Sequence, residues 1–168
     1  MKKFHNRDEM YELLYSLFEE ATPLKTDCGE LCSANCCKGD SETGMLLFPG
    51  EKTTLSVTVK DGRRLAVCGG KCSRSERPLS CRIFPFFPIV NEKEKIEAVI
   101  DSRGYGICPM IAHCDEIRFS RKFIKNVEKA GKILSSDKEC LDFLKDLTDE
   151  IYEESEIINK FKAEDKND

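Results

Sequence analysis

Four of the ten cysteines lie within residues 28–37, in a C-x3-C-x3-C-C pattern. They are Cys28, Cys32, Cys36 and Cys37. Zinc and iron–sulfur sites both need several thiolates delivered from short turns, so that the sulfurs converge on one centre. The spacing would align the first three on one face of a helix, but Gly29 and the segment 33–35 leave a helix and a loop both open. The block therefore predicts metal ligation without deciding which metal.

A second group of cysteines follows farther along the chain, namely Cys68, Cys72, Cys81 and Cys108. Gly69-Gly70 gives the first pair the tight backbone that a ligand loop needs, and Cys108 precedes a proline, as in bacterial ferredoxins. Eight candidate ligands exceed the four of one tetrahedral site, so two sites, or one site with spare cysteines, are both allowed. Neighbouring side chains diverge. Cys36 and Cys37 therefore either serve different centres, or one is a ligand and the other is packing.

The segment 76–88 between these cysteines is rich in proline and phenylalanine. Its prolines stiffen the chain, and Phe84, Phe86 and Phe87 are core residues, a dry wall around a site, or both. Arg77 and Arg82 flank Cys81, so they are predicted as second-shell residues that hydrogen-bond a thiolate, a carbonyl or an anionic ligand.

The remaining cysteines and the histidines fit structural roles better. Cys140 lies within an apolar helical pattern and is predicted as core. Cys114 begins a helix with no visible partner. His5 and His113 are expected at the surface.

Composition and charge exclude several classes of protein. The net charge is −4 and the pI is 5.4, without a strongly basic stripe, which argues against nucleic-acid binding. The longest apolar run, 83–90, is too short to span a membrane, and the N-terminus has no signal-peptide pattern. We therefore expect a cytoplasmic protein, where thiols stay reduced and metal ligation explains the cysteines better than disulfides do.

Hydrophobic periodicity predicts the elements that position these residues. Helices are expected over 7–20, 115–134 and 139–161. Strands are expected at 45–48, 54–60, 64–68 and 96–100, with Asp61-Gly62 as a hairpin turn. The fold class is thus α+β: a small cysteine-rich, metal-stapled domain with a short antiparallel sheet, an N-terminal helix and two C-terminal helices. We expect one domain over 1–168, with a metal-binding core at 28–109, a helical pair at 115–161 and a charged tail at 162–168.

The cysteine blocks, together with Arg77-Pro78-Leu79-Ser80-Cys81-Arg82-Ile83-Phe84-Pro85 and Cys108-Pro109, resemble a bacterial cysteine-cluster family described as a zinc- or iron-chelating domain. The resemblance covers about 28–109, and the gaps of three in the first block differ from the family's usual gaps of two. It implies metal binding through the eight cysteines named above, with zinc or iron, including an iron–sulfur cluster, as the cofactor. It implies no settled reaction.

Two other functions compete with a metal-binding protein. The first block is also similar to that of flagellin lysine methylases, which suggests a metal- or cluster-dependent, protein-modifying enzyme, although no S-adenosylmethionine signature is present. The other alternative is an interaction module, in which zinc only staples the loops and the C-terminal helices bind a protein partner.

Overall fold

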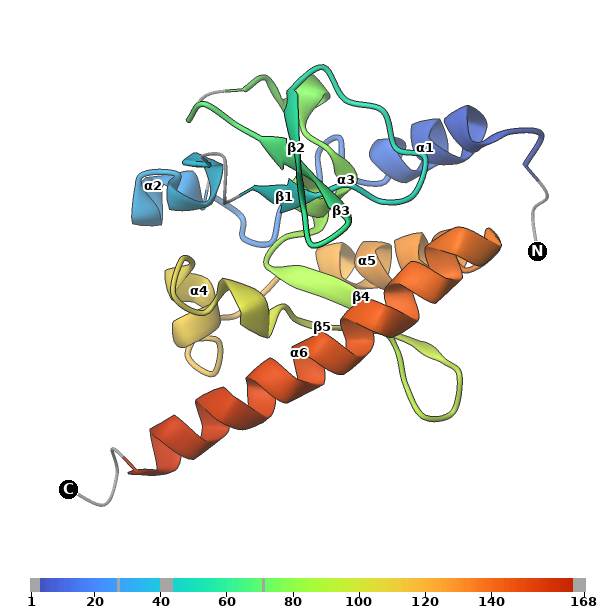
Figure 1. Cartoon of the computed structure of the whole chain (residues 1–168). Coiled ribbons are helices and arrows are strands. Elements are labelled where there is room, and N and C mark those ends of the chain that lie inside the picture. The colour runs from blue at the N-terminus through green and yellow to red at the C-terminus, as the bar shows by residue number, and fades with distance from the viewer. Residues whose placement is uncertain (1–3, 27, 40–43, 71, 165–168) are drawn as a thin grey trace.

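The structure is a computed structural model that describes residues 4–26, 28–39, 44–70 and 72–164. It is α+β, with two small antiparallel sheets, an N-terminal helix and a long C-terminal helix that runs along one side of the molecule (Figure 1). The predicted fold class is therefore confirmed, with two sheets in place of one.

The helices and strands are short except at the C-terminus. The helices are α1 (Arg7–Ser16), α2 (Gly29–Cys32), α3 (Leu79–Ile83), α4 (Pro109–Ala112), α5 (Arg121–Leu134) and α6 (Lys138–Glu164), with 3-10 helices η1 (Asn35–Cys37), η2 (Arg74–Glu76) and η3 (Ser102–Gly104). The strands are β1 (Met45–Leu46), β2 (Ser56–Lys60), β3 (Arg63–Val67), β4 (Phe86–Val90) and β5 (Ile96–Ile100).

The first sheet has the order β1-β3-β2, and it confirms the predicted hairpin. Lys60 pairs with Arg63 across the turn, where Asp61 and Gly62 adopt the positive φ angles of 51° and 76° that a two-residue hairpin requires. On the other side, β1 pairs with β3 through Met45 and Ala66. This sheet carries Cys68 at the end of its central strand.

The second sheet contains a strand that the sequence analysis did not predict. β4 pairs with β5 over Phe86–Val90, with Pro88 opposite Ala98. A proline argues against a central strand because it cannot donate a ladder hydrogen bond. In a two-stranded sheet, however, both strands are edge strands, so a proline can be accommodated. Here the Val90 N–H bonds to Thr148 Oγ1 of α6 at 3.0 Å, and that hydroxyl donates to the Leu144 carbonyl.

A phenylalanine-rich core lies between α1, α3, the β4–β5 hairpin, α5 and α6. Phe18, Phe48 and Phe123 are completely buried. The Phe48 ring stacks on Phe87 at 5.9 Å, and the Phe18 ring meets Phe123 edge-on at 5.7 Å. Each such side chain contributes about 1.5–3 kcal/mol through burial. This core is large enough to support the surrounding elements.

The helix boundaries differ from the predicted ones in understandable ways. α1 ends at Ser16, although Phe18 still reaches the core from the following turn. α5 begins only at Arg121, because the Ser120 hydroxyl caps it by accepting a bond from Phe123 N. α6 continues to Glu164, so the first residues of the predicted charged tail are helical, and 165–168 lie outside the described residues.

None of the helices in the described residues is both long and apolar enough to cross a lipid bilayer.

Candidate metal centre

The first cysteine block forms one helical turn that is then broken. Cys28 precedes α2, which ends at Cys32, and Ser33 and Ala34 follow with left-handed φ angles of 51° and 54°. The chain then enters η1, which carries Cys36 and Cys37. Both alternatives left open by the sequence are therefore partly realised: a helix at the start of the block and a turn in its middle.

The second block lies beside the first because of a short backbone pairing. Lys38 and Gly69 form an isolated antiparallel bridge, and Gly39 N donates to the Cys68 carbonyl at 3.2 Å. Gly70 adopts a φ of +91°, which glycine tolerates without strain. This pairing connects the segment after η1 to the end of β3, and so brings the two cysteine blocks together.

Cys81 and Cys108 reach the same region from two later segments of the chain. Cys81 lies in α3, within the proline-rich segment 76–88, and Cys108 is the residue before α4. The backbone N–H groups of Met110 and Ile111 face the Cys108 sulfur. Four separate segments thus deliver the eight predicted cysteines.

The thiols form two neighbouring groups. Cys28, Cys32, Cys36 and Cys108 line one small cavity of about 20 Å³, together with Phe84 and Ile107. In the other group, the thiol of Cys72 hydrogen-bonds that of Cys68, and Cys37 and Cys72 act electrostatically on Cys81. The thiols of Cys36 and Cys37 form a hydrogen bond where the two groups meet.

The electrostatic surroundings keep several of these thiols protonated when no metal is bound. Burial, followed by the neighbouring Cys37, Cys32 and Cys28, raises the pKa of Cys36 to about 12. Burial and nearby sulfurs also raise the pKa of Cys81. For Cys72, burial and Cys68 raise the pKa and Arg77 opposes them. A metal that binds here has to displace these protons.

The cysteine thiols are suitable ligands for a thiophilic metal, but the sulfur atoms of the described cysteines are not arranged around one point as in a metal site. All ten cysteines are free thiols, and two groups of four sulfurs match the donor type and number of zinc and iron–sulfur sites. Over residues 4–26, 28–39, 44–70 and 72–164, however, no three Cys, His, Asp or Glu side chains converge into a metal-binding group.

The two predicted second-shell arginines have different surroundings. Arg77 hydrogen-bonds Cys72. Burial works to lower its pKa, but the sulfurs of Cys72, Cys37 and Cys81 outweigh burial and raise it. Arg82 instead donates to the carbonyls of Arg77 and Ser75, at 2.7 and 3.0 Å, and lies over the Tyr15 ring. Arg77 thus contacts a predicted ligand, whereas Arg82 shapes the loop.

Of the three phenylalanines predicted to be core residues or to surround a site, two belong to the core and one lies beside the cysteines. Phe86 and Phe87 are buried in the phenylalanine-rich core. Phe84 lines the first cysteine cavity and packs close to Gly104, where an added Cβ would lie 2.7 Å from the ring. Phe84 is therefore the aromatic wall of the cysteine region.

Glu51, which was not predicted from the sequence, is a carboxyl group that supports the cysteine region from inside the core. Its side chain is completely buried and accepts bonds from Leu79 N at 2.6 Å, Phe48 N at 3.0 Å and the Tyr15 hydroxyl at 2.8 Å. Burial raises its pKa, although these donors oppose the shift. Because Leu79 begins α3, Glu51 fixes the helix that carries Cys81. A charged residue after Pro49-Gly50 looks like an ordinary turn residue, so the sequence held no signal for this role.

Cys140 fits the core position predicted for it, but Cys114 does not begin a helix as predicted: it follows α4, and α5 begins only at Arg121. Cys140 is completely buried, 3.9 Å from the Tyr11 hydroxyl, and burial, followed by Asp137, raises its pKa to about 12. Cys114 is half-buried beside Asp115, and His113 and His5 are exposed.

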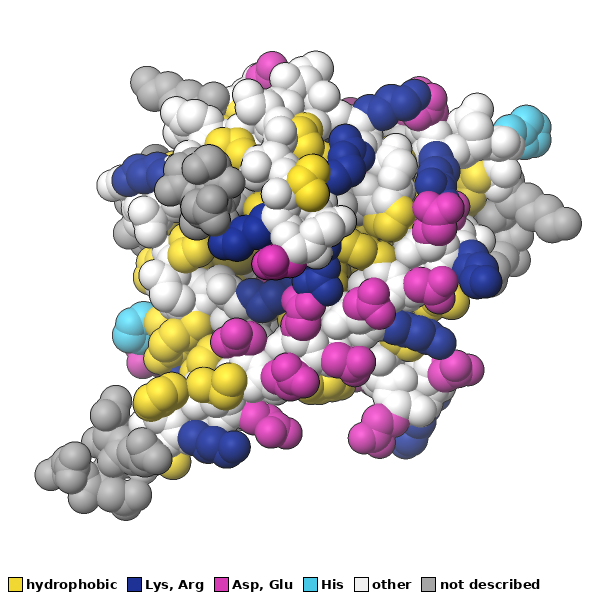
Figure 2. Space-filling model, in the orientation of Figure 1, with side chains coloured by type: hydrophobic (Ala, Val, Ile, Leu, Met, Phe, Trp, Pro, Cys, Tyr) yellow, Lys and Arg dark blue, Asp and Glu magenta, His cyan; other side chains and the backbone are white. Residues whose placement is uncertain are grey.

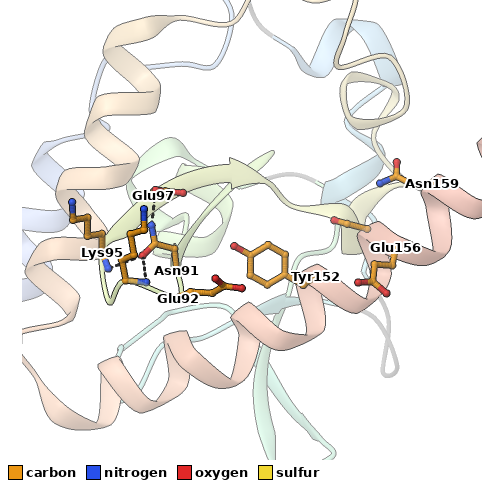
Figure 3. Close-up of a pocket in the computed structure, with 9 residues that line it drawn as sticks. Asn91, Glu92, Lys95, Glu97, Tyr152, Glu156 and Asn159 are labelled. Carbon is orange, nitrogen blue, oxygen red and sulfur yellow. Dashed lines mark hydrogen bonds between the residues drawn. The ribbon is translucent and has the colours of Figure 1, made fainter.

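A separate groove of about 760 Å³ lies between the β4–β5 turn and α6, and it contains no cysteine (Figure 3). Asn91 Nδ2 donates to Glu97 on the hairpin side, and Tyr152 and Glu156 line the groove from α6. The groove is polar and lacks the thiol donors of the two cysteine groups, so it is not part of the candidate metal centre.

The exposed side chains of α6 bear on the alternative of an interaction module. Tyr152, Ile157 and Phe161 are exposed, whereas the earlier apolar residues Leu144, Leu147 and Ile151 are buried. Carboxylates gather along this helix, and apolar side chains lie near its C-terminal end (Figure 2). The apolar face that this alternative requires is therefore confined to the end of the helix.

Comparisons of the chain with protein-family models, with curated proteins and with solved structures give no match.

Proposed function

We propose that this protein binds zinc or iron through its clustered cysteine thiolates. The observation that carries the proposal is that four separate segments bring eight cysteines into two adjoining groups. In the reducing conditions expected for this chain, such groups are explained by metal ligation better than by disulfides.

Each group would hold one centre. Cys28, Cys32, Cys36 and Cys108 would supply four sulfurs to the first, and Cys37, Cys68, Cys72 and Cys81 would supply four to the second. Four protein thiolates complete a tetrahedral zinc site or a cubane cluster and leave no open position. Bound zinc would cross-link the loops, whereas an iron–sulfur cluster would add one-electron transfer.

The protein's own groups would prepare these centres in three ways. Phe84 limits water access to the first group. Arg77 places a positive charge beside Cys72, which offsets the negative charge of a four-thiolate centre. Glu51 holds α3, and with it Cys81, in position.

Anaerobic purification followed by metal analysis and an absorption spectrum tests the proposal. We expect a colourless protein with two zinc ions per chain, or a brown protein with two clusters, which for cubane clusters means about eight irons per chain. Protein that contains no stoichiometric metal, or whose cysteines are paired as disulfides, would overturn the proposal.

Single serine variants test the assignment to two groups. Cys28→Ser or Cys32→Ser should remove the first metal only, and Cys72→Ser or Cys81→Ser the second only, because each centre has its own ligands. Cys140→Ser is the matched control, since its thiol lies in the hydrophobic core, and it should keep both metals. Loss of metal in Cys140→Ser would show that the ligands are wrongly assigned.

A further inference from the structure

Three arginines surround a small cavity next to the cysteine groups. Arg74, Arg77 and Arg82 line a space of about 50 Å³, which is closed by residues 21–23, Cys28, Cys81 and Phe84. In the part of the chain that the structure describes, the lining contains no carboxylate. The cavity is therefore positively charged on one side and apolar or thiol-lined on the others.

Two of these arginines are held in fixed positions by backbone carbonyls. Arg74 Nη2 donates to Phe18 O at 2.8 Å and to Ala21 O at 3.0 Å. Arg82 donates to the carbonyls of Arg77 and Ser75, and its guanidinium lies 4.6 Å from the Tyr15 ring centroid. These bonds use only some of the five N–H donors of each guanidinium, so donors are left for a ligand. Since the side chains are already ordered, binding a ligand would cost little additional conformational entropy.

The positive charges of Arg74 and Arg82 lie close enough together to act on each other. Among the residues that the structure describes, none of the three arginines forms an ion pair with Asp or Glu. Burial, and then the charge of Arg74, lower the pKa of Arg82, whereas Tyr15, Glu51 and Glu19 act to raise it. Repulsion between these like charges destabilises the site, and a bound anion would relieve it.

Arg77 also has an unused donor. Its Nε atom is buried and has no hydrogen-bond partner among the described residues. A buried donor that lacks a partner is unfavourable, and in native structures such a group calls for an explanation, such as a missing ligand, ion or water. The guanidinium fork is well suited to the oxygens of phosphate-type anions.

We propose that Arg74, Arg77 and Arg82 form a binding site for a tetrahedral oxyanion, either free phosphate or the phosphate group of a small molecule. The cavity size agrees, since a water needs about 10–15 Å³ of such space and the cavity would hold a few oxygen-sized groups. A nucleic-acid backbone would need a longer row of positive charges. Its three donors are arginines, but Cys28 and Cys81 in its lining are also ligands in the metal proposal, so the metal content of each sample has to be known.

Inorganic phosphate, titrated into the full chain at constant ionic strength, tests the proposal. Isothermal calorimetry and amide chemical shifts would follow binding, with chloride as the control anion and the metal content of each sample measured separately. We expect saturable phosphate binding that chloride does not reproduce. Phosphoserine as a second probe distinguishes the two ligand sources, because a site for free anion alone would reject it.

Arginine variants assign the site. Arg77→Gln and Arg74→Gln should each weaken phosphate binding at least tenfold, whereas Arg121→Gln, an exposed arginine at the start of α5, should leave it unchanged. Arg77→Lys, which keeps the charge but loses the fork, should bind at an intermediate strength and serves if a glutamine variant does not fold. Phosphate binding no stronger than chloride binding, or binding unchanged in folded Arg77→Gln, would overturn the proposal. Metal loss with intact phosphate binding would count against the metal proposal alone.

Discussion

The core and the cysteine region of this molecule are stabilised in different ways. The core buries a large cluster of apolar side chains from α1, α3, β4, β5, α5 and α6. In the cysteine region, α2, η1, η2 and α4 have only three or four residues each, and the buried cluster there consists of Cys108, Met110 and Ile111. Helices of this length are not stable by themselves.

The difference indicates where a metal would matter. A large apolar core is stable without cross-links, whereas a loop-rich segment with little to bury needs a staple. Metal binding should therefore stabilise the cysteine region selectively and leave the core folded when it is lost. Variants that affect one region and spare the other test this separation.

The largest effect is expected from truncating the core. Phe123→Ala removes a completely buried ring that packs against Phe18 and Phe86, and it should lower the free energy of unfolding by about 3–5 kcal/mol. Metal bound per folded chain should not change. Urea denaturation and metal analysis of the folded fraction would measure both quantities.

Phe161→Ala is the matched control, because this phenylalanine is 65% exposed on α6. It should change the free energy of unfolding by less than about 0.5 kcal/mol. If Phe123→Ala also lost metal from its folded fraction, the two regions would not be independent.

An intermediate effect is expected at Glu51, which connects the two regions. Glu51→Ala leaves the N–H groups of Leu79 and Phe48 and the Tyr15 hydroxyl without their acceptor, and should cost at least about 2 kcal/mol. Glu51→Gln keeps one acceptor oxygen and should cost less. Hydrogen exchange in α3 should become faster. Metal titration should show a lower affinity at the centre that includes Cys81. Unchanged exchange in α3 would contradict this connection.

The smallest effect is expected at the ion pair between α1 and the start of α6. Arg7 Nε and Nη2 donate to Asp137 at 2.8 and 3.1 Å. Burial acts to raise the pKa of Asp137, but the bonds from Arg7 and from Cys140 N outweigh it and lower the pKa. A carboxyl group with a lowered pKa stabilises the fold above its unfolded-state pKa, and this stabilisation is lost as the pH falls through the folded-state value.

Asp137→Asn keeps an oxygen that can cap α6 and removes only the charge. The pair is partly exposed, so the variant should be less stable by no more than about 1 kcal/mol at neutral pH. Urea denaturation at neutral and acidic pH should show the difference shrinking as the pH falls. A difference that stays constant into acid would assign the effect to packing.

Local patterns in the sequence predicted the core better than the cysteine region. Residues 54–60 alternate and are rich in β-branched side chains, and Asp61-Gly62 is a two-residue turn signal, so local rules suffice to predict the hairpin. Cys140 was recognised as core from its apolar helical neighbours. The strand at 86–90 was missed because Pro88 disfavours a strand locally, and only the contact with Thr148 in α6 shows how its edge is satisfied.

For the candidate site, residue types were predictable and their arrangement was not. Spacing within 28–37 indicates ligands, but the division into two groups depends on the bridge between Lys38 and Gly69, which are distant in sequence. Glu51 and Arg74 lie in ordinary polar segments. Their roles arise from tertiary contacts with α3 and with the carbonyls of residues 18 and 21.

The consecutive left-handed residues Ser33 and Ala34 restrict which amino acids this cysteine block can contain. L-residues pay about 1–2 kcal/mol each for this conformation, and a branched Cβ makes it far more costly. Valine, isoleucine or threonine at either position would therefore favour a continuous helix, with Cys28, Cys32 and Cys36 in one row. The C-x3-C-x3-C spacing alone is thus compatible with two shapes, and the unbranched residues Ser33 and Ala34 permit the broken one, which tertiary contacts have to stabilise.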